Sequence, residues 1–194
     1  MIGIKLQKGV TLIELIIVLT VFTLILGTTA SIFISVLNNQ RRTLQEQELF
    51  NQTSYAIEYI SRLVSDAVKD DDGSCLGSNY AGYNYLLTHF NSSDSFYEGI
   101  KFITKDDVCQ EFFLDSDAVF KEKKDSNDAQ NILSDSFNVI YARFIINGDK
   151  TLEGSSDEDS IQPRITFVLD VKNKEGQEKV IQTTVSQRNL NEQQ

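Results

Sequence analysis

The chain has 194 residues, two cysteines and a formal net charge of −10. This acidic balance argues against a general nucleic-acid binder, which needs a basic surface to neutralise phosphates, and no specific nucleic-acid site is evident. Beside an apolar stretch at the N-terminus, the length leaves room for one modest soluble domain, and no repeat or Pro/Ser-rich linker divides it.

The first predicted element is an apolar run that contains one carboxylate. Between Val10 and Leu26 the only charged residue is Glu14, and the apolar character continues to Leu37. A stretch of about 18 or more apolar residues is long enough to cross a bilayer as a helix. A carboxylate at the centre of such a helix costs about 2.5–3.5 kcal/mol, so Glu14 needs a functional reason. We expect a transmembrane helix over residues 10–37.

This stretch resembles the processing site of type IV pilin-like precursors, the group of pilins, minor pilins and pseudopilins. Their motif is a glycine followed by an apolar run with glutamate at its fifth place, matched here by Lys8-Gly9-Val10-Thr11-Leu12-Ile13-Glu14-Leu15. The resemblance implies that a prepilin peptidase/methyltransferase removes residues 1–9 as a leader by cutting after Gly9 and methylates the new terminus at Val10. It also implies that Glu14 guides filament assembly with other pilin-like subunits.

Elementary electrostatics is compatible with this role for Glu14. Cleavage before Val10 creates an ammonium group, and Glu14 lies four residues further on, on the same face of a helix. A carboxylate in the first turn also interacts favourably with the positive end of the helix dipole. The charge of Glu14 can therefore be compensated by its own terminus or by that of a neighbour.

An ordinary secretory signal is the main alternative for the N-terminus. Lys5 and Lys8 give a basic start, and Thr28-Thr29-Ala30 fits a small-residue cleavage site before Ser31. Secretory signals, however, have apolar cores of about 7–15 residues, whereas this core is longer and carries a charge. We therefore favour the pilin-type signal. A plain uncleaved membrane anchor is the third interpretation.

A second, amphipathic half of the same helix is expected over residues 38–69. Apolar residues recur there at three-to-four spacing, which predicts one face packed on a sheet. Proline is absent before Pro163, so we expect one uninterrupted helix from Val10 to about Val68, ended by Asp70-Asp71-Asp72-Gly73. The lack of a proline near Ser31 differs from many major pilins and favours a minor subunit.

Residues 70–194 are expected to form loops and an antiparallel sheet. Residues 73–99 read as a loop rich in Tyr, Asn, Ser and Gly, either pinned to the sheet by its aromatic side chains or used for adhesion. Strand patterns follow, at residues 99–104, 110–114, 118–121, 139–147, 164–171 and 179–187, with a turn at 173–176.

The alternating strands predict which side chains face the core. In the fourth predicted strand these are Ile140, Ala142, Phe144 and Ile146, and in the fifth Ile165, Phe167, Leu169 and Val171. A helix followed by an antiparallel sheet is an α+β fold, with a long N-terminal helix packed on a C-terminal sheet. The closing segment, residues 184–190, is similar to the end of J-type pseudopilins and related minor pilins.

The two cysteines are Cys75, just after the helix, and Cys109, between predicted strands. Outside the cytoplasm, such a pair in a small domain is most simply a disulfide, and we favour this over two free buried thiols. A Cys–His nucleophile would have to use His89, whose surroundings supply no catalytic signature. The spacing of these residues does not fit a zinc site.

Two acidic loops, residues 70–73 and 155–160, contain the oxygen ligands that calcium prefers. Neither matches the twelve-residue calcium loop, so we interpret both as solvated and predict no metal site. No phosphate-binding loop, dinucleotide fingerprint or nucleophile elbow occurs either. The sequence therefore predicts neither an enzyme nor a cofactor.

The predicted function is structural: a minor pilin or pseudopilin of a type IV pilus, a type II secretion pseudopilus or a related DNA-uptake filament. The protein would cross the cytoplasmic membrane once, with the soluble pilin-like domain of residues 38–194 outside, and then enter the filament. The alternative is a membrane-anchored extracytoplasmic binding or adhesion domain that does not polymerise.

Overall fold

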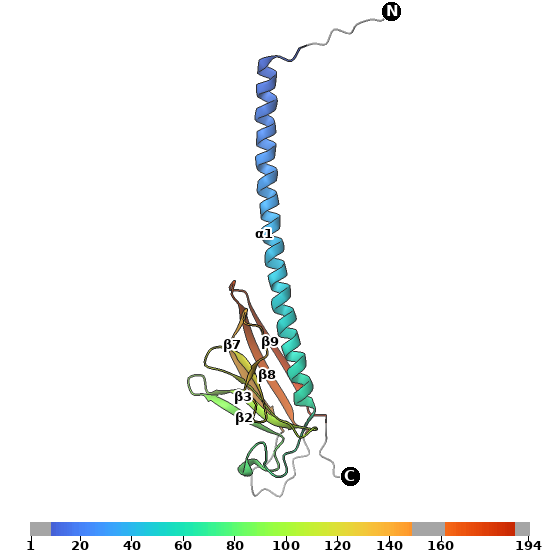
Figure 1. Cartoon of the computed structure of the whole chain (residues 1–194), viewed down its shortest axis with the longest axis vertical. Helices are drawn as coiled ribbons and strands as arrows, with labels where there is room; N and C mark the ends of the chain where they lie inside the picture. Colours follow the sequence, from blue (N-terminus) through green and yellow to red (C-terminus); the bar gives the residue numbers. More distant parts are fainter. Residues whose placement is uncertain (1–8, 149–161, 189–194) are drawn as a thin grey trace, which may run out of the picture. The chain divides into compact units, whose positions relative to one another are not determined.

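The computed structural model describes residues 9–148 and 162–188 (Figure 1). Helix α1 (Leu12–Ser65) leads into a sheet, with one short 3-10 helix at Ser78–Tyr80. In the described part the strands are β1 (Ala67–Val68), β2 (Tyr85–Asn91), β3 (Phe96–Thr104), β4 (Cys109–Leu114), β5 (Phe120–Lys124), β6 (Gln130–Asn131), β7 (Phe137–Asn147), β8 (Arg164–Asn173) and β9 (Glu178–Ser186).

The chain forms two compact units, Met1–Gln45 and Glu46–Gln194, which we describe separately. The first unit contains the N-terminal part of α1, in which every residue from Val10 to Leu44 is exposed. The second unit contains the rest of α1 and the sheet. Helix α1 itself runs without interruption through both units over 54 residues, as the absence of proline predicts.

In the second unit all paired strands are antiparallel, in the order β6-β5-β4-β3-β7-β8-β9, with β1 and β2 both pairing with β3. This helix-then-sheet arrangement confirms the α+β prediction. The turn between β8 and β9 closes where the sequence places it, since the Gly176 amide donates to the Asn173 carbonyl oxygen at 3.1 Å.

The core of the second unit lies between α1 and the sheet. The helix buries residues at three-to-four spacing, which confirms the predicted amphipathic stripe: Leu49, Thr53, Ala56, Ile60 and Val64. The four apolar residues of this stripe share one buried cluster with a row of phenylalanines from five strands, Phe102, Phe112, Phe120, Phe144 and Phe167. Burial of such a stripe and row supplies the main driving force for the packing.

The helix is shorter than predicted at both ends. It begins at Leu12 rather than Val10 and ends at Ser65 rather than Val68. Beyond its end, Ala67 and Val68 form β1, and Ala67 pairs with Thr104 of β3. The side-chain amide of Gln187 also donates to the Ala67 carbonyl oxygen at 3.0 Å. These tertiary partners bond to the backbone of Ala67 and Val68 in an extended conformation. The helical spacing of apolar residues in the sequence therefore continues past the last residue of the helix.

The prediction of a loop over residues 73–99 is wrong for its second half. Residues Tyr85–Asn91 form β2, and β3 begins at Phe96, so the two strands make a hairpin. The fully buried Tyr85 packs on Phe102 and donates its hydroxyl to the Val64 carbonyl oxygen at 2.8 Å. This burial outweighs the turn-forming composition of the segment.

Two further strand predictions needed correction. Ile140 is 50% exposed and Val139 is buried instead, because the β7–β8 pairing shifts register between Val139 and Tyr141. The strand expected at 118–121 is β5, Phe120–Lys124, which extends into the charged run. The predicted alternation of β8 is confirmed, with Ile165, Phe167, Leu169 and Val171 all fully buried.

Candidate functional site

The start of the described chain is open and non-helical. Gly9, Val10 and Thr11 precede α1, and the first helical hydrogen bond runs from the Leu15 amide to the Thr11 carbonyl oxygen at 3.2 Å. No heavy atom lies within 4 Å of the place where a Cβ on Gly9 would stand. The Gly9–Val10 peptide bond therefore lies in exposed, non-helical backbone, the conformation in which a peptidase can bind a chain.

Glu14 lies in the first turn of α1, and its side chain is exposed. The free N–H groups of that turn and the helix dipole favour a carboxylate there. Val10 is outside the helix, so the four-residue relation expected between Val10 and Glu14 on one helical face is not formed in the uncut chain. The carboxylate of Glu14 is thus available to a partner other than its own backbone neighbours.

The helix after Glu14 presents apolar side chains around its whole circumference. Each large apolar side chain from Val10 to Ile34 is at least 50% exposed. The only candidate membrane span in the described residues is α1, with a mean hydropathy of 2.3 in its most apolar window. A helix that is apolar all round requires lipid or other helices around it.

Four threonine hydroxyls in this part of α1 are hydrogen-bonded within the helix. The hydroxyls of Thr20, Thr23 and Thr28 each donate to the carbonyl oxygen three residues earlier, at 2.8, 2.8 and 2.9 Å. Thr29 donates to the Ile25 and Leu26 carbonyl oxygens. Side-chain donors that bond to their own helix can enter a lipid environment without an unsatisfied polar group.

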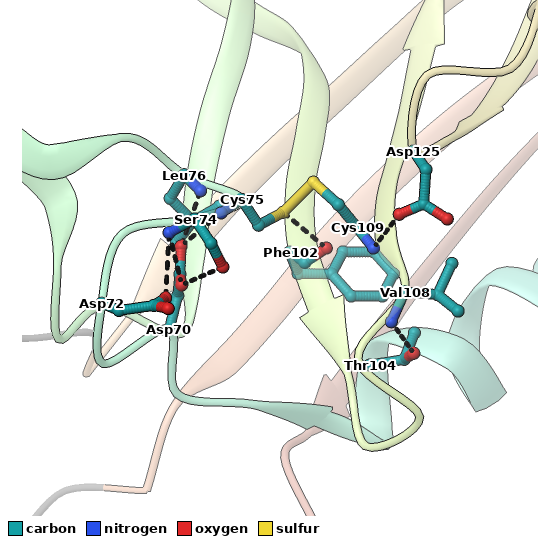
Figure 2. The surroundings of a disulfide bond; sticks show 10 residues. All are labelled: Asp70, Asp72, Ser74, Cys75, Leu76, Phe102, Thr104, Val108, Cys109 and Asp125. Atoms are coloured by element: carbon teal, nitrogen blue, oxygen red, sulfur yellow. Dashed lines mark hydrogen bonds between the residues drawn. A yellow bond between two sulfur atoms is a disulfide. The ribbon is translucent and has the colours of Figure 1, made fainter.

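In the first acidic loop, the carboxylate of Asp70 is hydrogen-bonded by backbone amides of the same loop. Asp70 is 1% exposed and accepts the amides of Ser74 at 3.1 Å, Cys75 at 3.0 Å and Leu76 at 2.6 Å (Figure 2). Both of its oxygens are therefore engaged by backbone donors. Among the described residues no group of three or more metal-ligating side chains occurs, and the second acidic loop, 155–160, lies outside them.

The cysteines are joined in the structure, next to the Asp70 loop. Cys75 and Cys109 form a disulfide with their Cα atoms 5.3 Å apart (Figure 2). The bond connects the loop after α1 to β4, where the Cys109 amide donates to Asp125 Oδ1 at 2.9 Å. Neither sulfur is a free thiol, so the pair supplies no nucleophile.

His89 lies on β2 and contacts Phe113 and Glu111 of β4. Its ring stacks on Phe113 with centroids 4.5 Å apart, and its Nε2 lies 3.3 Å from Glu111 Oε1. Gly99 makes room for this stack, because a Cβ there would stand 2.9 Å from His89 Cδ2 and 3.0 Å from Phe113 Cβ. This arrangement packs the imidazole onto the sheet.

One partly buried polar cluster was not anticipated from the sequence. Tyr59 of α1 donates its hydroxyl to Glu122 Oε1 at 2.6 Å, and Lys124 Nζ donates to the same hydroxyl at 3.0 Å. The Gln110 side-chain amide also donates to Glu122. Burial, followed by the hydrogen bond to Glu122, raises the pKa of Tyr59 above its ordinary value. No local pattern connects Tyr59 with Glu122, which is 63 positions away.

The comparisons with known proteins concern the N-terminal segment alone. Residues 4–30 match the model of the prokaryotic N-terminal methylation motif. No curated protein and no solved structure matches the chain significantly. The matched range contains Gly9, Val10 and Glu14 and the first part of the exposed apolar helix. The match supports a type IV pilin-like protein that is processed at a prepilin signal.

Proposed function

We propose that the chain is a structural subunit, a minor pilin or a pseudopilin, of a type IV pilus, a type II secretion pseudopilus or a related DNA-uptake filament. The observation that carries this proposal is the methylation-motif match over residues 4–30, which contains Gly9 and Glu14. Proteins with this motif are structural subunits rather than enzymes.

Maturation begins at the exposed backbone before α1. The prepilin peptidase/methyltransferase cuts after Gly9, releases residues 1–9 and methylates the amino group of Val10. The non-helical, open setting of Gly9 supports access to this bond. Because Val10 lies outside α1, the new terminus can move relative to Glu14 before it finds a partner.

The membrane holds the subunit until assembly. Residues 10–37 cross the cytoplasmic membrane once, and residues 38–194 lie outside it. Exposed apolar side chains and internally bonded threonine hydroxyls support this assignment of the span. In the filament the same side chains pack against the helices of other pilin-like subunits, so that one surface serves both environments.

Glu14 selects the assembled position. The carboxylate of one subunit pairs with the Val10 ammonium of a neighbour, which removes two charges that would otherwise be buried among apolar helices. An isolated buried charge costs several kcal/mol, so a subunit in the wrong register is strongly disfavoured.

The mass of the N-terminal peptide of the protein isolated from its own host tests this proposal. A methylated chain that starts at Val10 is the expected result. A chain that starts at Ser31 would establish ordinary secretion, and an intact Met1 would establish a plain anchor; either result overturns the proposal.

The proposed boundary near residue 38 has a separate test. A truncated chain that begins at Gln40 should be soluble and folded, because the stripe of α1 that it keeps is buried by its own sheet. If this truncation only aggregates while the full chain is well folded in detergent, the division at residue 38 is wrong.

A non-polymerising anchored binding domain is the second candidate. It is favoured by the exposed aromatic pair on the β2–β3 hairpin, where Phe90 is 58% and Tyr97 37% exposed with ring centroids 5.0 Å apart. Shearing filaments from the host separates the two candidates: a subunit is recovered with the filaments, whereas an anchored domain stays with the membrane.

A further inference from the structure

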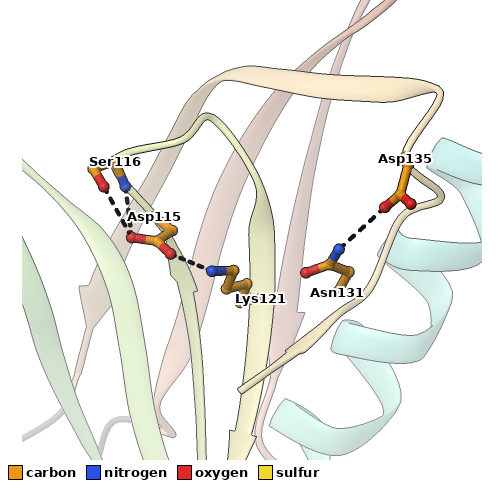
Figure 3. A network of polar contacts seen from close by, with 5 residues as sticks. All are labelled: Asp115, Ser116, Lys121, Asn131 and Asp135. Atoms are coloured by element: carbon orange, nitrogen blue, oxygen red, sulfur yellow. Dashed lines mark hydrogen bonds and ion pairs between the residues drawn. The ribbon is translucent and has the colours of Figure 1, made fainter. Parts of the chain in front are cut away.

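The two strands at the ends of the main strand order, β6 and β9, differ in how well they are protected. At one edge β6 has two residues, and its neighbour β5 contains Lys121, Lys123 and Lys124. Polar contacts border this edge, from Lys121 to Asp115 and from Asn131 to Asp135 at 3.3 Å (Figure 3). Short strands and lysines are usual devices against unwanted strand pairing. This edge is therefore closed to partners.

The opposite edge, β9, lacks most of these devices. It is nine residues long, pairs with β8 alone, and has neither a proline nor a register shift. Its charged residues, Glu178 and Lys179, lie at one end, and the rest of the strand is β-branched or polar and uncharged. A long and regular edge of this kind can pair with another strand.

The register shows which backbone groups of β9 are free. The Gln187 amide donates to the Pro163 carbonyl oxygen and the Asn173 amide to the Gln177 carbonyl oxygen, both at 3.0 Å. These two pairs bracket the β8–β9 ladder, in which hydrogen-bonded pairs alternate with non-hydrogen-bonded ones. The odd-numbered residues therefore bond to β8. The groups directed away from it belong to the even-numbered Val180, Gln182 and Thr184, and no described residue pairs with them.

Apolar side chains border this edge on both faces. Helix α1 runs beside β9 in the same direction, because Gln177 contacts Glu46 at 3.3 Å and the Arg188 amide donates to the Ser65 carbonyl oxygen at 2.7 Å. Phe50 lies nine residues before Tyr59, about half a circumference around the helix. Tyr59 bonds to β5, so Phe50 lies on the flank towards β9, where it is 53% exposed. Val180 of β9 itself is 57% exposed.

We propose that β9 is a docking edge that accepts an extended segment of a different protein as an added strand. Such a segment satisfies the free groups of Val180, Gln182 and Thr184 with its own backbone. Apolar side chains on the two faces of the segment would contact Phe50 on one side and Val180 on the other. A carboxylate at one end of the segment would pair with Arg188. The Arg188 side chain is 80% exposed, and its Nη1 lies 3.7 Å from Asp66 Oδ1.

A second copy of this chain does not fit the edge. Two identical edges related by a twofold axis pair antiparallel. Since α1 and β9 run in the same direction, the two helices would then point in opposite directions. Chains held in one membrane by the same end cannot do so. This exclusion rests on the proposed function, whereas the free edge itself does not.

Amide hydrogen exchange on the full-length protein tests the proposal residue by residue. The protein is compared in a gently extracted membrane complex from its host and after separation from its partners in detergent. The amides of Val180, Gln182 and Thr184 should exchange at least about tenfold more slowly in the complex, whereas those of Ile181 and Thr183 should be protected in both. Equal exchange of the three even-numbered amides in both samples would overturn the proposal.

Two variants separate strand addition from simple coverage of the surface. Gln182→Pro removes one free-edge amide and no bond to β8, whereas Gln182→Ala keeps the amide. The proline variant should lose the protection of Val180 and Thr184 in the complex, and the alanine variant should keep it. Retained protection in Gln182→Pro contradicts the proposal. If the isolated proline variant is unfolded, Val180→Lys takes its place in the comparison with Gln182→Ala. The lysine puts a charge on the edge without changing the backbone, and it should likewise remove the protection of Gln182 and Thr184 in the complex.

The outcomes also separate this proposal from the proposed function. Protection that rises with the concentration of the isolated chain would mean self-pairing and would overturn the choice of a different protein. A chain that is never recovered with filaments contradicts the proposed function, while the exchange of Val180, Gln182 and Thr184 can still be read in the membrane complex.

Discussion

The two parts of α1 belong to one continuous helix, but their apolar residues are exposed in the first part and largely buried in the second. In the part before Glu46, each large apolar side chain from Val10 to Ile34 is at least half exposed. In the part after Glu46, the sheet buries a stripe of apolar residues, and only Phe50 and Tyr55 among the large apolar side chains are more than half exposed. The first pattern requires lipid or other helices, whereas the second is satisfied within the chain. Stability of the fold should therefore depend on the second part and assembly on the first.

The largest expected effect on stability comes from a matched pair of phenylalanines. Phe102 is 0% exposed and Phe22 is 58% exposed. Phe102→Ala should lower the free energy of unfolding of the second unit by about 3–5 kcal/mol, because it leaves a cavity beside Tyr85 and Phe112. Phe22→Ala should change it by less than about 0.5 kcal/mol. Urea unfolding in detergent measures both, and equal losses would contradict the division of roles.

Glu14→Gln tests the assembly role of the first part. The substitution keeps the shape of the side chain but leaves a neighbour's ammonium without its partner, a loss of about 3–5 kcal/mol for a fully buried pair. Incorporation into sheared filaments should fall sharply, and membrane insertion should persist, because a charge no longer enters lipid. Glu14→Asp, which keeps the charge, is the control. Undiminished incorporation of a stably expressed Glu14→Gln protein would exclude the role.

Removal of the disulfide should affect the second part alone. Replacing Cys75 and Cys109 with serine releases a loop of 34 residues and should cost about 2–4 kcal/mol of unfolding free energy. Hydrogen exchange should rise in the segment after α1, where the Asp70 hydrogen bonds remain as the other restraint. Peptide mapping without reductant provides the control, and two alkylatable thiols in the exported protein would show that the bond is not formed.

A substitution in the polar cluster between α1 and β5 should have a smaller effect on the free energy of unfolding. Tyr59→Phe keeps the ring contact with Phe112 but removes the hydroxyl that donates to Glu122. A loss of about 1–2 kcal/mol in unfolding free energy is expected for a hydrogen bond to a charged group. Tyr55→Phe, at a position 61% exposed, should be nearly neutral. Equal effects of the two substitutions would show that the cluster does not fix the helix on the sheet.

The smallest expected effect is a pH-dependent gain in the free energy of unfolding when Asp170 is replaced. Burial, followed by the hydrogen bond and charge of Glu178, raises the pKa of Asp170 above its ordinary value. The protonated form of Asp170 contributes to the free energy of unfolding. This contribution is fully present below the pKa of the unfolded chain, about 3.9, and is lost as the pH rises through the pKa of the folded protein. Asp170→Asn should therefore stabilise the protein at pH 7, by less than about 1 kcal/mol, and have no effect near pH 3. Unfolding midpoints at both pH values measure it.

The elements that the sequence predicted well are those whose pattern repeats locally. The stripe of Leu49, Ala56, Ile60 and Val64 recurs at the helical period, and the inward residues of β8 alternate strictly. Both patterns record which side of an element is buried. The turn at Asn173 is equally local, because its hydrogen bond joins residues three apart.

The elements that were missed depend on residues distant in the chain. The hairpin of β2 and β3 is held by Tyr85, which packs on Phe102 and bonds to Val64. Ile140 faces outward because a register shift in the β7–β8 pairing cannot be read from alternation. In the same way, the composition of the Asp70 loop shows oxygen ligands, but not that backbone amides already occupy them.

The sequence by itself determined the N-terminal signal, the apolar helix with its single carboxylate and the α+β order of elements. These features are covalent or periodic, so they need no partner to be recognised. Only the tertiary structure decided where α1 ends, how Glu122 meets Tyr59, and that β9 is left as a long unprotected edge. The physical reason is that burial and backbone pairing are set by which distant segments meet, and hydrogen bonds and apolar contacts made there outweigh local preference.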